Sequence, residues 1–365
     1  YLKSAIFKRK ENSLEDFYIN SFGKKLYSMF FENYTENLWG RHPSQIDPSW
    51  GAQRTKGLSI FGIIKDSLGK VFKVKNRKVN TSLIEEFSYP KLGPGQLWEV
   101  TADEVQKKGG TIYKNAKVVG VRKNADNIAT GVVYEENGVK KEMTGDYVIS
   151  SMPIKDLVAG INDVPEKYAD IAAGLPYRDY MTVGVLISKL NLQNKTRIPT
   201  MGNIVPDDWV YVHDRNVSMG RFQIYNNWSP YLVKDVEHTV WMGLEYFCNE
   251  GDSMWSMSDD DFARMGIREM ITMKLIDDES KVLDYHVERV KKAYPAYFDT
   301  YDQIDELRSY LDTIPNLFCV GRNGQHRYNN LDHSMCTSFE AVKNILAGVT
   351  DKKNVWSVNT EEEYH

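Results

Sequence analysis

The sequence predicts a mixed α/β protein with two domains, and three observations support this. The length of 365 residues corresponds to about two domains of ordinary size. A composition of 42% hydrophobic and 26% charged residues is typical of a globular chain that can bury a core. The hydrophobic period also changes along the chain, from helical spacing near the N-terminus to short β-branched runs, and back to helical spacing near the C-terminus.

The N-terminal part is predicted to be helical. Ser13 is a good N-cap residue, and Asp16 stands three residues later in the position of a capping-box acid. Apolar residues then recur at steps of mostly three and four, which predicts a buried stripe made of Phe17, Leu26, Met29, Phe30 and Tyr34. A short helix is expected at SIFGIIKDSL, and a longer one within KLGPGQLWEVTADEVQKKGG, where Gly109 and Gly110 end it.

Strands are predicted for most of the middle of the chain. The runs KVVGV, TGVVYEE, VKKEMTG and DYVISSM are short, rich in β-branched residues and separated by Asn, Asp and Gly turns. Further strands are expected in DYMTVGVLISKL, DWVYVHD, GRFQIYNN, TVWMGLEYF and DYHVERVKKAYP. A helix is expected from the Asp259–Asp261 cap to about Leu275, and the C-terminal part reads as a strand (LFCVG), a polar loop and an amphipathic helix ending at Gly348.

Composition excludes several classes of function. A net charge of −4 argues against a broad nucleic-acid surface. No run of about 18 apolar residues is present, so no membrane span is expected, and the charged start YLKSAIFKRK is not a signal peptide. The three cysteines lack CxxC spacing, so no disulfide framework is predicted. Four of the seven histidines (His42, His213, His238 and His286) show no metal-ligand spacing, so no metal site is predicted. A reducing, cytoplasmic location fits these features best.

The loop GRNGQHRYNNLDHS, which begins at Gly321, is the strongest candidate site. It joins a buried strand to a helix N-terminus, where free N–H groups and the helix dipole favour an anion or an electron-rich ring edge. Arg322 and Arg327 add forked, positively charged donors suited to phosphate. The alternative is a polar strand–helix turn with Asp332 or Ser334 as the N-cap. Two arginines and a tyrosine exceed what a cap requires, so we favour the anion site.

The same loop resembles, without gaps, the GRxGxxRYxxMD signature of UDP-galactopyranose mutases, a family within the amine-oxidase and protoporphyrinogen-oxidase class of flavoproteins. Further segments are similar to this family over nearly the whole chain: FGKKLYSMFFENYTENLWGRHPSQI, YPKLGPGQLWEVTADEVQKKGGTIYKNAKVVGV, DYVISSMPI and GRFQIYNNWSPY. Asn330 and Leu331 replace the Asp and Met of the bacterial signature, and the eukaryotic form also has Asn at the first of these positions.

The resemblance implies an FAD-binding, Rossmann-like flavoprotein fold with an inserted mixed-sheet substrate domain. No GxGxxG fingerprint is present, and the expectation is a chain truncated at the N-terminus, which puts tight FAD binding in doubt. The expected domains are a helical segment over 1–80, an FAD-binding part over 81–155, a substrate-binding domain over 156–315, an FAD-binding strand–loop–helix over 316–350 and a tail over 351–365.

The resemblance also implies roles for single residues. Arg322 and Arg221 would hold the diphosphate of a UDP-sugar, with Tyr328 hydrogen-bonded to it and Asn330 near the substrate. Leu331, Asp332 and His333 would lie at the pyrimidine edge of the flavin, and Val118 at its adenine. Arg322 and Ser334 are also expected among the cofactor-binding residues. From the residues alone, Arg221 reads equally well as an exposed strand residue paired with Asp214, and Val118 as a core valine. The aromatic residues Trp209, Tyr211, Tyr225, Trp228 and Tyr231 could stack on a base or sugar, although core packing is the commoner outcome.

The leading hypothesis is therefore a UDP-galactopyranose-mutase-like enzyme. The resemblance implies that it interconverts pyranose and furanose nucleotide sugars for cell-surface polysaccharide (LPS) synthesis, in a redox-neutral reaction that depends on reduced flavin. The second hypothesis is an FAD-dependent oxidoreductase of the amine-oxidase or protoporphyrinogen-oxidase type, in which the two arginines would hold a carboxylate or stabilise the fold. The third is a scaffold protein that has lost its cofactor. UDP binding separates the first hypothesis from the second.

Overall fold

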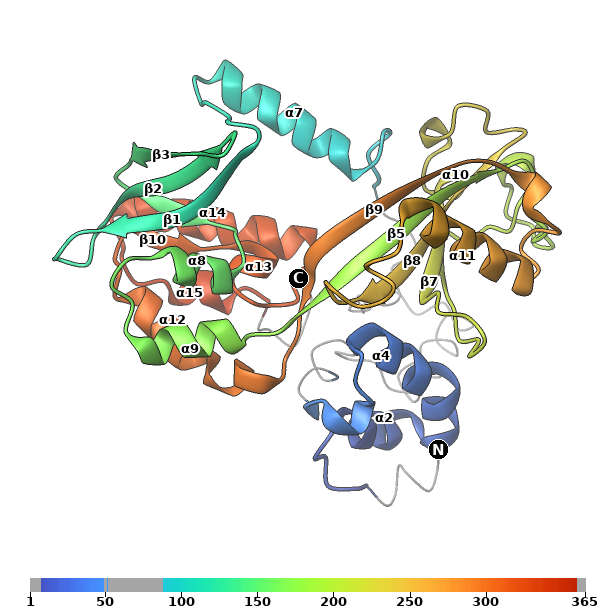
Figure 1. The fold of residues 1–365 in the computed structure, drawn as a ribbon, viewed down its shortest axis with the longest axis horizontal. Coiled ribbons are helices and arrows are strands. Elements are labelled where there is room, and N and C mark those ends of the chain that lie inside the picture. Colours follow the sequence, from blue (N-terminus) through green and yellow to red (C-terminus); the bar gives the residue numbers. More distant parts are fainter. Residues whose placement is uncertain (1–7, 49–50, 52–87, 360–365) are drawn as a thin grey trace, which may run out of the picture. The chain divides into compact units, whose positions relative to one another are not determined.

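A computed structural model describes residues 8–48, 51 and 88–359 of the chain (Figure 1). The chain forms two compact units, and each is described by itself. The first unit comprises residues 1–112 and 178–291, and the second comprises residues 113–177 and 292–365. The helix predicted at SIFGIIKDSL and much of the helical segment predicted over 1–80 lie outside the described residues. The boundary between the units at residue 177 falls later than the predicted domain boundary at 155, and that at residue 291 falls earlier than the one at 315.

The N-terminal helices of the first unit begin at the predicted cap. The helix α2 (Leu14–Phe22) starts after Ser13, whose Oγ accepts a hydrogen bond from the N–H of Asp16. It is followed by α3 (Lys24–Leu26), a π-helical turn (Tyr27–Phe31) and α4 (Glu32–Trp39).

The predicted apolar stripe of these helices is wrong for three of its five residues. Leu26, Met29 and Phe30 are exposed, and Phe17 and Tyr34 are half-buried. The buried apolar residues are instead Leu14, Tyr18, Ile19, Phe22, Tyr27, Leu38 and Trp39. Two backbone irregularities explain the change of face. Gly23 interrupts the helix with a φ of 83°, and the π turn adds a residue to one turn, so a fixed step of three or four does not continue across them.

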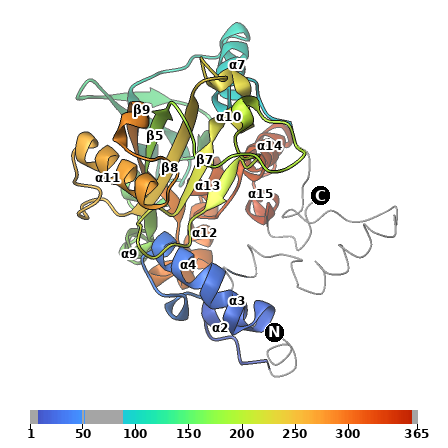
Figure 2. The same ribbon diagram turned by 90° about the vertical axis from the view of Figure 1, so that its right-hand side faces the viewer.

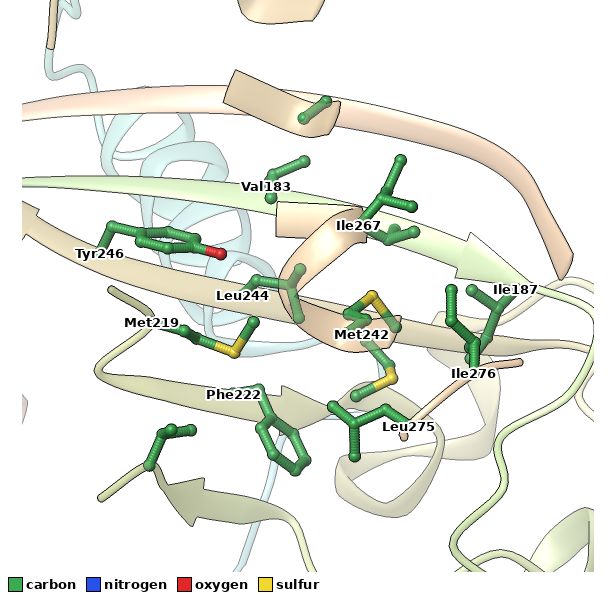
Figure 3. Packing of buried hydrophobic residues seen from close by; sticks show 14 of the residues in the cluster. Val183, Ile187, Met219, Phe222, Met242, Leu244, Tyr246, Ile267, Leu275 and Ile276 are labelled. Atoms are coloured by element: carbon green, nitrogen blue, oxygen red, sulfur yellow. The ribbon is translucent and has the colours of Figure 1, made fainter. Parts of the chain in front are cut away.

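An antiparallel sheet forms the core of the first unit, with strand order β6-β7-β8-β5-β9. Its strands are β5 (Tyr177–Ile187), β6 (Trp209–Tyr211), β7 (Arg221–Ile224), β8 (Val240–Cys248) and β9 (Val282–Pro295). Alternate residues such as Val183, Phe222 and Leu244 point to one face and share an apolar cluster with Ile267 of the helix α11 (Asp259–Thr272), as Figure 3 shows. The helix lies beside the sheet (Figure 2). The intervening residues, which include Arg221 and Glu245, therefore occupy the opposite face. The helices α7 (Pro94–Lys107) and α10 (Tyr225–Trp228) complete the unit.

The second unit contains a three-stranded antiparallel meander and a two-stranded parallel sheet. The meander is made of β1 (Ala116–Lys123), β2 (Ala129–Glu136) and β3 (Val139–Thr144), and the parallel pair of β4 (Val148–Ser150) and β10 (Leu317–Cys319). The helices are α8 (Ile154–Gly160), α9 (Glu166–Gly174), α12 (Ile304–Asp312), α13 (Gly321–Gly324), α14 (Leu331–Ala347) and α15 (Lys353–Ser357).

The two segments of the second unit are joined by a buried side chain as well as by strand pairing. The Nδ2 of Asn316 donates to the carbonyl oxygens of Ala129 and Asp146, and its Oδ1 accepts from the N–H of Ala129. Leu157, Leu175, Leu307 and Leu317 belong to the apolar core that both segments build.

Most of the predicted elements are present, including all the predicted strands and the helices α7, α11 and α14. The helices α8, α9 and α12 were not predicted. Each has only seven to nine residues, which is too short for a helical period to stand out in the sequence.

Candidate functional site

The candidate loop folds tightly against the end of the parallel sheet. The N–H of Val320 donates to the carbonyl oxygen of Ser150 at 2.9 Å, and Gly321 follows with a φ of 75°. A Cβ on Gly324 would lie 2.6 Å from the carbonyl oxygen of Ser150, a distance that excludes any side chain. The two glycines of the GRNG segment therefore allow the chain to turn directly over the carboxyl end of β4.

This turn places Arg322 over two tyrosine rings. Its Nε donates to the carbonyl oxygen of Asn329 at 2.8 Å and its Nη1 to that of Ala293 at 3.1 Å. The guanidinium carbon lies 4.5 Å from the ring centroid of Tyr328 and 5.5 Å from that of Tyr294, and these rings stack on each other. Among the described residues, no carboxylate forms an ion pair with Arg322. It is thus a half-buried guanidinium, held by two carbonyls and without an ion-pair partner in the described chain, which suits it to bind an anion.

Arg327 has a different role from the predicted phosphate contact. Its side chain is buried, and its Nη1 donates to the carbonyl oxygens of Trp356 and Val358, both at 2.9 Å. Burial lowers the pKa of this guanidinium. Arg327 therefore fastens α15 and the residue after it to the loop, and the positive charge of the site comes from Arg322.

His326 lies inside the loop and is fully buried. Its φ of 46° is left-handed, and its Nε2 is 3.0 Å from the carbonyl oxygen of Ala296. Burial lowers the pKa of His326 to about 4, so the ring is neutral at pH 7 and Nε2 donates to that carbonyl. Its Nδ1 is buried and has no hydrogen-bond partner among the described residues.

The N-cap of α14 is Asn330, in place of the predicted Asp332 or Ser334. The side chain of Asn330 accepts from the N–H of His333, and the Nδ1 of His333 accepts from the N–H of Asn330 at 3.3 Å. Ser334 Oγ donates to the carbonyl oxygen of Asn330 at 2.9 Å. This capping box uses the N–H of His333. The N–H groups of Leu331 and Asp332 lie in the first helical turn, where the helix itself supplies no acceptor.

The first turn of α14 can therefore donate to an electron-rich group. The N–H groups of Leu331 and Asp332 carry the positive end of the helix dipole, which suits an anion or an electron-rich ring edge. Val118, predicted at the adenine, is half-buried in β1 beside the irregularity between Val118 and Gly120, and it is absent from the buried core of the unit.

Arg221 belongs to the first unit, on the sheet face opposite the apolar core. It is buried and forms an ion pair with Glu245, whose carboxylate also accepts from the Nε2 of Gln223. The predicted alternative of an exposed Arg221 paired with Asp214 is wrong, because Asp214 accepts instead from Asn216. Sequence reasoning missed Glu245, although a single acid within the apolar run TVWMGLEYF signals a buried carboxylate that needs a partner.

Aromatic side chains surround Arg221 on this face. Its guanidinium carbon lies 4.5 Å from the ring of Trp209 and 5.2 Å from that of Phe247. Trp209 and Tyr211 stack with centroids 6.3 Å apart, and they are 40% and 46% exposed. The expectation that these aromatics form core is therefore wrong for both. We call the set Tyr34, Trp209, Tyr211, Arg221 and Phe247 the aromatic face.

The described residues contain neither a metal-binding cluster nor a membrane-spanning helix. No group of three His, Cys, Asp or Glu side chains could hold a metal ion. No helix in residues 8–48 and 88–359 is both long and apolar enough to cross a membrane.

Comparison with known proteins shows similarity in structure only. No protein-family model and no curated protein sequence matches the chain. The structure of a reduced UDP-galactopyranose mutase matches all of this chain and 75% of its own, with a TM-score of 0.74 and 18% identity. A putative protoporphyrinogen oxidase from Exiguobacterium sp. 255-15 matches 88% of this chain and 66% of its own (TM-score 0.59, 12% identity). The structure of a Pyrococcus furiosus protein matches 94% of this chain and 70% of its own (TM-score 0.51, 10% identity).

These matches identify the fold class, which is that shared by UDP-galactopyranose mutase and protoporphyrinogen-oxidase-like proteins. Within that class, the chain is similar over its full length to the mutase. The predicted α/β flavoprotein fold is confirmed at the level of the fold.

Proposed function

We propose that the protein is a flavin-dependent enzyme that acts on a UDP-sugar and interconverts its pyranose and furanose forms. The observation that carries this proposal is the state of Arg322, a guanidinium held by two backbone carbonyls over Tyr328 and Tyr294, with no carboxylate ion-paired to it in the described chain. A fixed, uncompensated guanidinium is suited to phosphate oxygens.

Four residues then have roles toward the substrate. Arg322 and Arg221 each bind phosphate oxygens, Tyr328 supports Arg322 and hydrogen-bonds to the diphosphate, and Asn330 lies near the sugar. The exposed rings of the aromatic face supply stacking surface for the base or sugar. Holding the diphosphate on fixed cations stabilises the charge that develops as UDP departs, and it keeps UDP in place for its return.

The cofactor proposed is FAD, which supplies an electron-rich nitrogen nucleophile when bound in reduced form. The first turn of α14 would hold the ring edge through the N–H groups of Leu331 and Asp332, supported by His333 and Ser334, and Val118 would meet the adenine. In this proposal the protein is cytoplasmic and serves the synthesis of surface polysaccharide such as LPS.

The second candidate is an FAD-dependent oxidoreductase. One observation favours it, namely the similarity to the putative protoporphyrinogen oxidase. In that case Arg322 would bind a substrate carboxylate, which a guanidinium also recognises.

Calorimetric titration with UDP, uridine and UDP-galactose tests the proposal, together with the absorption spectrum of the purified protein. We expect saturable UDP binding that is much tighter than uridine binding, and a flavin spectrum that shifts when UDP is added to the dithionite-reduced protein. Conversion of UDP-galactofuranose by the reduced protein would then establish the reaction. A yellow protein that does not bind UDP supports the oxidoreductase, and a protein with neither flavin nor UDP affinity supports the scaffold.

A further inference from the structure

Arg178 is a buried arginine that binds three backbone carbonyls of the first unit. Its Nε donates to the carbonyl oxygen of Leu38 at 2.9 Å, and its Nη2 donates to those of Asn37 and Phe247, each at 3.2 Å. Its side chain is 9% exposed. Because Arg178 lies at the start of β5, one guanidinium joins the beginning of β5, the end of β8 and the end of α4.

The helix end explains why a cation occupies this place. The last carbonyls of an α-helix have no partner within the helix and carry the negative end of its dipole. Gly40 ends α4 in a left-handed conformation with a φ of 64°. Its N–H donates to the backbone carbonyl oxygen of Glu36, which leaves the carbonyl oxygens of Asn37 and Leu38 for Arg178. The planar fork can reach both of these and the strand at once, whereas a lysine offers a single point of attachment.

The two segments that Arg178 fastens both carry rings of the aromatic face. Tyr34 of α4 meets Tyr211 edge to face, with centroids 5.0 Å apart, and Phe247 at 6.2 Å. Phe247, at the end of β8, lies beside the guanidinium of Arg221. Arg178 thus binds the carbonyl of Phe247 and the helix that carries Tyr34. Because Tyr34 contacts Tyr211 and Phe247 contacts Arg221, Arg178 is linked to both through one intervening residue.

We propose that Arg178 is a positioning residue of the nucleotide site: by joining the end of α4 to the end of β8, it holds Tyr34 and Phe247 against Tyr211 and Arg221. This inference rests on the proposed function, because it assigns the aromatic face to nucleotide binding. Arg178 itself is buried, with its guanidinium bound to backbone carbonyls, and it acts on a nucleotide only through these rings.

Gly40 allows Arg178 to be disturbed without being replaced. A Cβ on Gly40 would lie 3.3 Å from Cζ and Nη1 of Arg178, so Gly40→Ala presses on the guanidinium. Gly251→Ala is the matched control. Gly251 also has a positive φ, of 90°, in the same unit, but a Cβ there meets nothing within 4 Å. Both variants carry the cost of a left-handed alanine, and only the first disturbs Arg178.

The experiment measures UDP affinity by calorimetry, and it follows the ¹⁹F resonances of Trp39 and Trp209 in protein labelled with 5-fluorotryptophan. We expect Arg178→Lys and Gly40→Ala to shift both resonances and to weaken UDP binding about 5- to 20-fold, which lies within the range of coupling between neighbouring groups. Gly251→Ala should change neither quantity. In a Tyr34→Leu background, Arg178→Lys should weaken UDP binding by a smaller factor than it does in the unchanged protein, since one of the two rings through which it acts is gone.

Two results would overturn the proposal. One is an unchanged UDP affinity and Trp209 resonance in folded Arg178→Lys and Gly40→Ala. The other is a full, additive loss of affinity on adding Arg178→Lys to Tyr34→Leu. If the unchanged protein does not bind UDP, the proposed function fails independently of this inference. The role of Arg178 in positioning the aromatic face is then still tested by comparing the Trp209 resonance of Gly40→Ala with that of Gly251→Ala.

Discussion

Replacing Arg322 tests the anion site most directly. Arg322→Met removes the guanidinium and keeps much of the side-chain length, and Arg322→Lys keeps the charge but loses the fork. A hydrogen bond to a charged group contributes about 1.5–3 kcal/mol, so Arg322→Met should weaken UDP binding by about 10- to 150-fold. Arg322→Lys should lie at the lower end of this range, because a lysine offers one point charge.

The cost to folding should be smaller. The replacements remove two hydrogen bonds to the carbonyl oxygens of Asn329 and Ala293, each worth about 1 kcal/mol. Urea denaturation should therefore give a protein that is still folded, with an unfolding free energy lower by about 1–2 kcal/mol.

The assay compares UDP with uridine, which has the same base and ribose but no phosphate. Uridine affinity should be unchanged in both Arg322 variants, while UDP affinity falls. Arg327→Lys is the control, because Arg327 lies in the same loop but donates to the carbonyls of Trp356 and Val358. It should lower stability and leave UDP affinity intact. Equal losses for UDP and uridine, or no loss in folded Arg322→Met, would refute the assignment of Arg322 to phosphate.

Two further predictions concern the aromatic face and the buried histidine. Trp209→Ala should weaken uridine and UDP alike by about 1–3 kcal/mol, the scale of stacking a base on an aromatic ring. Trp98→Ala, an exposed tryptophan on α7, is the control, and calorimetry showing a loss for UDP alone would contradict the stacking role. The pKa of His326 falls from 6.5 to about 4 on burial, so the unfolded chain binds a proton that the folded chain does not, and stability should drop by up to about 3 kcal/mol as the pH falls from 6.5 to 4. In urea denaturation His326→Asn, which tolerates the left-handed φ, should show a shallower decline, and an identical decline in both proteins would exclude His326 as its source.

Secondary structure was predictable from the sequence wherever its signals were local. The Ser13 cap with Asp16, the β-branched runs between turn residues and the glycine stop after α7 depend on neighbours along the chain. The apolar stripe of the N-terminal helices failed because Gly23 and the π turn at Tyr27–Phe31 change the phase of the helix, and no short-range pattern reports such a change.

The candidate site was predictable in part. The loop at Gly321 was found because its glycines, arginines and tyrosine lie close together in sequence, and the resemblance added Arg221. The separate roles of Arg322 and Arg327 were not predictable, because they depend on which carbonyls lie near each guanidinium in the folded chain. The exposure of Trp209 and Tyr211 depends likewise on β6 being the outer strand of its sheet. The alternation of residues along a single strand does not predict the position of that strand in the sheet.

The second unit is built from two segments that are far apart in the sequence, residues 113–177 and 292–365, and this has a consequence for synthesis on the ribosome. Asn316 binds Ala129, 187 residues away in sequence, and β4 has no strand partner until β10 emerges. The meander β1-β2-β3 and much of the first unit depend on shorter separations and can form while the chain is still growing. The second unit must instead wait until Asn316 and β10 have emerged, since closing so long a loop carries an entropic cost that only these late contacts repay. Throughout that interval residues 113–177 present apolar surface, so the nascent protein depends most on chaperones until β10 is complete.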